Sequence, residues 1–149
     1  MEVSEVKLKK AEDLYKGWFD DTPFGPYDYS LIYKSFGAVV FKQDIGRWQG
    51  DTQILLKNQE LDKFGYLMFG WGSCSGCDSL QRCDSYDEID ELIGLLWGQI
   101  RWFDDDKEAL KFFEEHKWDC DWGYSPTFVE ACKTFFSSRL ALEAEEKVG

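Results

Sequence analysis

Three short apolar runs, joined by short connections, constrain the fold of this chain more than any other feature. The runs are Gly37–Lys42, Thr52–Lys57 and Gly65–Gly70, each rich in β-forming residues and bounded by Gly, Asp or Asn. The connections, residues 43–51 and 58–64, suit hairpins, because parallel strands need crossovers of a dozen or more residues. The sequence therefore predicts a three-stranded antiparallel meander.

The segment before the meander has a helical pattern followed by an irregular one. Ser4 is placed as an N-cap, and apolar residues from Leu8 to Trp18 follow a helical spacing. They predict an N-terminal helix that ends near Gly17. Residues 18–30 contain two prolines and a glycine among several aromatic residues, so we expect a loop packed across the core.

Three helices are expected after the meander. Ser85–Glu88 is a capping box, and a buried apolar stripe at helical spacing follows it from Ile89 to Phe103. Asp104–Asp106 ends that helix and caps a shorter one, and Ser125-Pro126 begins the last. The predicted fold is thus α+β: an N-terminal helix, the meander, then three helices packed on one face of the sheet.

The size and composition favour one folded domain. The chain has 149 residues, a length usual for a single domain, and we expect residues 1–149 to form one. Seven Trp, seven Tyr and twelve Phe argue against disorder, because disordered acidic chains are poor in large apolar side chains. No apolar run approaches the roughly 20 residues that cross a bilayer, and the N-terminus lacks the apolar core of a signal peptide. We expect an intracellular, cytoplasmic protein with no membrane partner.

The negative charge is concentrated in one part of the sequence. The formal net charge is −12, and residues 1–50 contribute only −1 of it. Between Asp78 and Asp121, 14 carboxylates face five basic side chains, a net charge of −9. Such a region repels phosphate backbones and attracts basic proteins, so the sequence argues against direct binding of nucleic acid.

Two acidic clusters are the candidate partner-binding residues. Carboxylates at helix N-termini stabilise the helix dipole, which explains part of their placement. Rows of carboxylates can also imitate a nucleic-acid backbone, and Trp48 and Trp71 are candidate aromatic anchors. The leading hypothesis is a non-enzymatic acidic protein that binds and inhibits a basic protein of nucleic-acid processing or host defence. The acidic residues concerned are Asp84, Asp87, Glu88, Asp90, Glu91, Asp104, Asp105 and Asp106.

A glycine-rich cysteine loop supports an alternative, metal-based hypothesis. Cys74 and Cys77 have the spacing of a zinc-finger pair, and Cys83 follows six residues later. His116, the one histidine of the chain, or Cys120 would complete a zinc site. The usual second close pair of ligands is missing.

Two thiol chemistries and a purely structural role also remain open for this loop. Cys74-x-x-Cys77 lies between a predicted strand and a possible helix, as redox pairs do, although the thioredoxin-like βαβ pattern is absent. A Cys nucleophile would need His116 as base and Asp119 or Asp121 to orient it. Alternatively, residues 70–78 form a tight structural corner in which the cysteines act as small apolar side chains.

The cysteine loop also carries a resemblance to a protein family. Trp48-Gln-Gly-Asp51 followed by Gly65-Tyr-Leu-Met-Phe-Gly-Trp-Gly-Ser-Cys-Ser-Gly-Cys-Asp-Ser-Leu-Gln81 resembles a signature of small uncharacterised proteins of bacteria and their phages. The likeness covers residues 37–103. It implies no activity, but it implies that the Gln-Gly-Asp loop and the cysteine loop form a common site. A phage origin fits the hypothesis of an acidic inhibitor of host defence.

Overall fold

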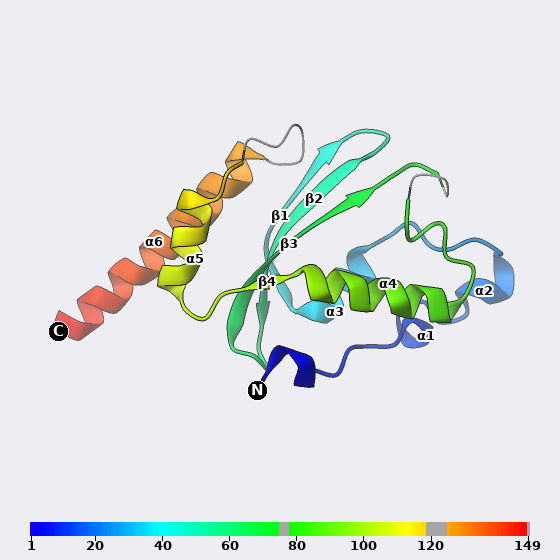
Figure 1. Ribbon diagram of the computed structural model, residues 1–149, viewed down its shortest axis with the longest axis horizontal. Coiled ribbons are helices and arrows are strands. Elements are labelled where there is room, and N and C mark those ends of the chain that lie inside the picture. The colour runs from blue at the N-terminus through cyan, green and yellow to red at the C-terminus, as the bar shows by residue number, and fades with distance from the viewer. Residues whose placement is uncertain (75–77, 119–124, 149) are drawn as a thin grey trace.

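The centre of the protein is a four-stranded antiparallel sheet in the order β1-β2-β3-β4 (Figure 1). The computed structural model describes residues 1–74, 78–118 and 125–148. The α+β class and the antiparallel pairing of β1, β2 and β3 agree with the prediction, but the sheet has a fourth strand and each of the predicted strands is longer than the apolar run that predicted it. The strands are β1 (Ala38–Gly46), β2 (Gly50–Asn58), β3 (Lys63–Trp71) and β4 (Arg101–Trp102).

The short fourth strand was not predicted. The helical stripe expected to reach Phe103 ends at Gln99, and Arg101 and Trp102 pair instead with β3. Gly65 makes this pairing possible, because a Cβ at that position would lie only 2.6 Å from the Trp102 ring. The packing of Trp102 over Gly65 therefore favours pairing with β3 over a longer α4, although Ile100 and Phe103 continue the helical spacing.

The N-terminal third forms four short helices in place of the predicted helix and loop. Ser4 lies inside a single turn, and Glu2 occupies the N-cap position instead. Gly17 has a φ of 76° and separates two one-turn helices, which are too short to be stable without tertiary contacts. The elements are a 3-10 turn (Val3–Glu5), α1 (Ala11–Leu14), α2 (Trp18–Asp21) and α3 (Ser30–Phe36).

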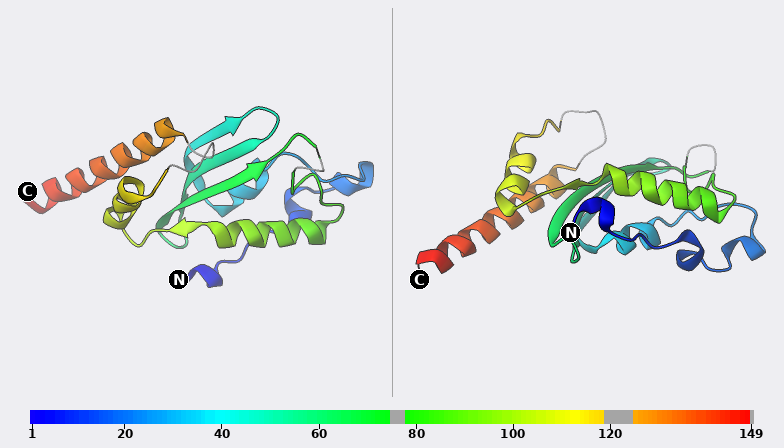
Figure 2. Two further views of the ribbon diagram at one scale, coloured as in Figure 1. Left: turned by 45° about the horizontal axis from the view of Figure 1, so that its top comes forward. Right: turned by 60° about the horizontal axis from the view of Figure 1, so that its bottom comes forward.

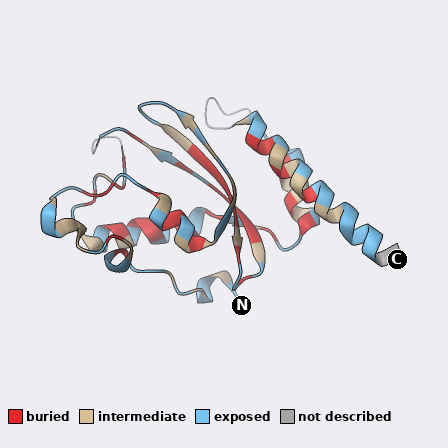
Figure 3. Ribbon diagram, turned by 180° about the vertical axis from the view of Figure 1, so that it is seen from behind, coloured by how far each residue is buried: buried red, intermediate tan, exposed pale blue. Residues whose placement is uncertain are grey.

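The three later helices begin where the sequence predicts. Ser85 caps α4 (Tyr86–Gln99) by accepting a hydrogen bond from Glu88 N–H, and Asp105 caps α5 (Asp106–Glu115) in the same way. The last helix, α6 (Pro126–Val148), begins with a bond from Phe128 N–H to Ser125 Oγ. Residues 141–146 of α6 are exposed, and this end projects from the body (Figure 3). In the part of the chain that the structure describes, no helix combines the length and the apolar character needed to span a bilayer.

Helices cover both faces of the sheet, so the prediction that they cover one face is wrong. On one face, Ile54 and Leu67 pack with α1, α3 and α4. On the other, Leu55 and Tyr66 pack with α5 and α6. Neighbouring residues of a strand point to opposite faces, so the unbroken run Ile54-Leu55-Leu56 serves both clusters. The sheet is the middle layer of three (Figure 2).

Candidate functional site

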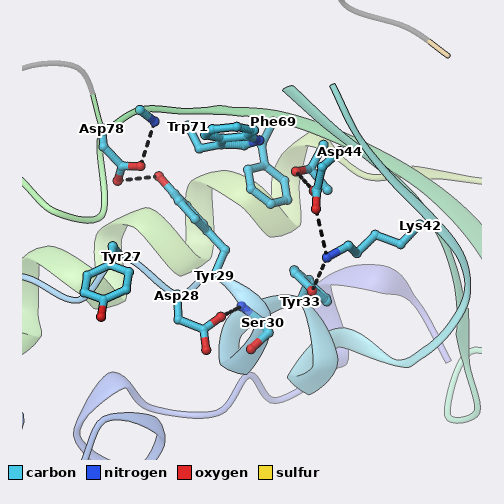
Figure 4. A pocket seen from close by; sticks show the side chains of 12 residues that line it. Tyr27, Asp28, Tyr29, Ser30, Tyr33, Lys42, Asp44, Phe69, Trp71 and Asp78 are labelled. Carbon is cyan, nitrogen blue, oxygen red and sulfur yellow. Dashed lines mark hydrogen bonds and ion pairs between the residues drawn. The ribbon is translucent and has the colours of Figure 1, made fainter. Parts of the chain in front are cut away.

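A pocket of about 260 Å³ opens between the segment that leads into α3 and one end of the sheet (Figure 4). Aromatic rings make up much of its wall, so we refer to it as the aromatic pocket. It lies on the face of the sheet that α3 and α4 cover. Its lining residues are Tyr27, Asp28, Tyr29, Ser30, Tyr33, Lys42, Asp44, Thr52, Phe69, Trp71, Gly72 and Asp78.

Asp78 fixes the wall of this pocket at the cysteine loop. The residue is 1% exposed, and Oδ1 accepts hydrogen bonds from the Tyr29 hydroxyl at 3.0 Å, Leu80 N–H at 2.9 Å and Gln81 N–H at 3.0 Å. Oδ2 accepts from Gly72 N–H at 2.9 Å. These four donors compensate the buried negative charge. Asp78 thus joins the end of β3 to the segment before α3.

A self-contained ion pair forms the opposite wall. Lys42 and Asp44 are two residues apart on β1 and point to the same face, where Lys42 Nζ lies 3.2 Å from Asp44 Oδ2. Asp44 Oδ1 also accepts a hydrogen bond from the Thr52 hydroxyl at 2.6 Å, and Lys42 reaches the Tyr33 hydroxyl at 3.4 Å. Each charge of the pair is neutralised locally.

The Asp28 carboxylate and the Trp71 indole N–H are the polar groups of the pocket with few or no hydrogen-bond partners among the described residues. Asp28 is exposed and accepts a hydrogen bond from Ser30 N–H at 2.8 Å. The hydrogen bond from the Ser30 side chain holds the pKa of the Asp28 carboxyl below its ordinary value. The indole Nε1 of Trp71 is buried and has no hydrogen-bond partner among the described residues. Such a donor costs free energy unless an acceptor reaches it.

The two halves of the sequence signature are neighbours in the sheet. Gly50 lies opposite Trp71, and Asp51 lies opposite Gly70. Trp48, at the β1–β2 turn, is 78% exposed and can contact a partner, whereas Trp71 is partly buried in the wall of the pocket. The candidate aromatic anchors therefore occupy different environments.

A second candidate site is a cluster of carboxylates at one end of the molecule, which we call the acidic end. Here α1, α2 and the start of α4 lie together (Figures 1 and 2). Ala11 N–H donates to Asp90 Oδ1 at 2.8 Å, and the Tyr86 hydroxyl donates to Tyr15 O at 2.9 Å. Its exposed carboxylates are Glu12, Asp13, Asp20, Asp21, Asp84, Asp87, Glu88 and Glu91, none of which forms an ion pair within the described residues.

The other predicted acidic residues do not join this surface. Asp104, Asp105 and Asp106 lie beyond the opposite end of α4, which is 14 residues and therefore about 20 Å long. Asp104 forms an ion pair with Lys63, Asp105 caps α5, and Asp106 is buried against Arg139. Asp90 is engaged with α1 as described. Glu88 accepts a hydrogen bond from Asp84 N–H, so five of the eight predicted acidic residues have structural partners.

The candidate zinc ligands are not brought together within the described residues. Cys74 is exposed, whereas the Cys83 thiol is buried in the α4 cluster and donates to Ser79 O. His116 stacks on Phe112 at the end of α5, in the neighbourhood of the other cluster. No group of three or more His, Cys, Asp or Glu side chains among residues 1–74, 78–118 and 125–148 has the geometry for a metal ion. Cys77 lies outside the described residues, as do Cys120 of the zinc hypothesis and Asp119 and Asp121 of the nucleophile hypothesis.

The described buried thiols have the properties of apolar core residues. Burial raises the pKa of Cys83 to about 11 and that of Cys132 to about 12. A thiol must lose its proton to act as a nucleophile or metal ligand, so these two cysteines are unreactive at neutral pH.

The chain matches no protein-family model, no curated protein and no solved structure with which it was compared. Sequence reasoning missed the pocket residues Asp28, Tyr29, Lys42 and Asp44. The alternation Lys42-x-Asp44, which puts two opposite charges on one face of a strand, was the available signal. Nothing local indicates that the segment before α3 faces that strand.

Proposed function

We propose that this protein is a non-enzymatic binding protein whose acidic end docks on a basic protein. The supporting observation is a group of eight exposed carboxylates, seven on α1, α2 and α4 and one, Asp84, just before α4, without ion-pair partners among the described residues. Four of these carboxylates come from α1 and α2, in a part of the sequence that is nearly neutral on average. Their field favours a cationic surface and speeds association with it.

The basic partner that we propose is one that handles nucleic acid, including proteins of host defence. A groove that binds phosphates carries clustered Lys and Arg side chains, and such a groove also accepts closely spaced carboxylates. A protein of net charge −12 is repelled by nucleic acid itself. It therefore competes with nucleic acid for the same partner, which makes inhibition the expected consequence of binding.

The test compares two variants of equal net charge. In the first, Glu12, Asp20, Asp87 and Glu91 are all replaced by Lys, which reverses charge at the acidic end and leaves Glu88 and Asp90 in their structural hydrogen bonds. In the second, the same number of exposed carboxylates is reversed elsewhere, at Glu114, Glu115, Glu145 and Glu146. Binding to a labelled decalysine peptide is measured by fluorescence anisotropy as a function of salt concentration.

A localised docking surface predicts that binding depends on where the charges are reversed as well as on how many are reversed. We expect reversal at the acidic end to weaken peptide binding by more than about tenfold at low salt and to flatten its salt dependence, with a much smaller effect of the control reversal. The wild type and the control should also displace the peptide from a DNA duplex, whereas the acidic-end variant should not. Equal losses in the two variants would refute a localised docking surface.

A further inference from the structure

The aromatic pocket has the chemistry of a site for a planar cation. Tyr29, Tyr33, Phe69 and Trp71 contribute rings to its wall, and the centroids of Tyr29 and Phe69 are 4.7 Å apart. Tyr27, at the mouth, is 72% exposed (Figure 4). The faces of aromatic rings carry negative electrostatic potential and attract cations. The volume of about 260 Å³ is slightly below the range typical of drug-sized ligands and suits a single side chain.

The charges around the pocket also favour a cation. Lys42 and Asp44 neutralise each other, and Asp78 is satisfied by its four donors. Asp28 is the lining carboxylate without an ion pair within the described residues, although the Ser30 hydrogen bonds and the charges of Lys34 and Lys42 stabilise its ionised form. In Figure 4 the Asp28 carboxylate and Trp71 lie at opposite ends of the labelled group, with the Tyr29 side chain between them in this view. A cation in the pocket would have the carboxylate toward one end and aromatic rings along the wall.

Trp71 offers a ligand its ring and not its N–H. Its side chain lines the pocket, but the indole Nε1 is buried and has no hydrogen-bond partner among the described residues. A ligand in the pocket therefore contacts the ring and leaves the N–H in its buried position.

We propose that the aromatic pocket binds an arginine side chain of the basic partner. This inference rests on the proposed function, because it assumes a basic protein as partner. The guanidinium is planar, stacks on aromatic rings and donates two parallel hydrogen bonds to a carboxylate such as that of Asp28. Lysine offers the same charge without the planar donor pair, so arginine is the preferred residue.

Nuclear magnetic resonance tests this site without knowledge of the partner. The probe is N-acetyl-L-arginine N-methylamide, which carries a guanidinium and peptide carbonyls, added to the full chain labelled with ¹⁵N. The readout is the indole N–H resonance of Trp71, assigned by its loss in Trp71→Phe. We expect a saturable shift of this resonance, and binding about tenfold weaker in Asp28→Asn. Asn keeps an acceptor for Ser30 N–H, so the variant should retain the local fold.

Ligands that match the arginine probe in shape or in charge show which property of the ligand the pocket recognises. The citrulline analogue has the same shape without the charge and should bind at least about tenfold more weakly; the lysine analogue should fall between the two. Equal binding of the citrulline analogue, or no saturable shift with the arginine probe at millimolar concentration, would overturn the proposal. Binding of methyl glucoside in preference to the arginine probe would also overturn it and identify a sugar site.

The acidic-end variant separates this inference from the proposed function. The variant should bind the arginine probe as the wild type does, because its four substitutions lie outside the pocket lining. Loss of decalysine binding with retained arginine binding supports both proposals. If the acidic-end variant keeps wild-type decalysine binding, the proposed function fails, and the arginine titration still decides the chemistry of the pocket.

Discussion

Replacement of Asp78 by Asn should be among the most destabilising polar substitutions in this protein. The carboxylate accepts three hydrogen bonds at Oδ1, from Tyr29, Leu80 and Gln81, and one at Oδ2, from Gly72. In Asn an amide N–H₂ takes one of the two oxygen positions. If it faces Gly72 N–H, two buried donors oppose each other, at a cost of about 1–3 kcal/mol. The other three bonds lose their charged acceptor, at roughly 0.5–1 kcal/mol each.

The expected loss is therefore about 4 kcal/mol in the free energy of unfolding, measured by urea denaturation. This corresponds to a fall of roughly 8–16 °C in Tm for a chain of this size. Tyr29→Phe provides the comparison, because it removes one of the four donors and leaves Leu80 N–H bonded to Asp78; it should cost about 1–2 kcal/mol. A loss below about 1 kcal/mol for Asp78→Asn, or a larger loss for Tyr29→Phe, would refute this account of the loop.

Two further predictions concern stability and reactivity. Gly94→Ala and Gly98→Ala should each raise the free energy of unfolding by about 0.5–1 kcal/mol, because both lie in α4 with open space at the Cβ position; Gly65→Ala, whose Cβ would collide with β4, should lower it. Urea denaturation measures all three, and destabilisation by either α4 substitution would contradict the exposure of that face. Cys83 and Cys132 should resist iodoacetamide at pH 8, because burial raises the pKa of both and reduces the thiolate fraction about a hundredfold or more. Labelling of these two thiols should accelerate as the pH rises toward 11 or when the protein unfolds. Peptide mass mapping measures the extent of labelling at each cysteine. Rapid labelling of the native protein at pH 8 would contradict the burial of these thiols. The stability that these buried thiols contribute is present below their unfolded pKa and is lost as pH rises through the folded values.

Local signals predicted the elements better than their arrangement. The capping residue Ser85 and the apolar runs act through neighbours in sequence, and the helices and strands they predict are confirmed in outline. The covered faces were predicted wrongly, because a short apolar run such as Ile54-Leu55-Leu56 does not show whether one or both sides of a strand are buried. Whether one or both faces are buried depends on which helices pack against each side of the sheet.

The candidate sites were predictable only in part for the same reason. The acidic start of α4 is visible in the sequence, but its neighbours Glu12 and Asp20 come from segments whose own charges nearly cancel. Asp78 adjoins the cysteine loop in the sequence, yet its partner Tyr29 is 49 residues away. Contacts of this separation leave no local pattern in a single sequence.

The burial of β2 on both faces links the halves of this protein energetically. Ile54 belongs to the cluster under α4, and its chain neighbour Leu55 belongs to the cluster under α5 and α6. If either set of helices detached, one apolar face of the same strand would be exposed to water while the other face lost the rigid surface on which it packs. The acidic end and the α5–α6 end are therefore expected to unfold together, in one cooperative transition.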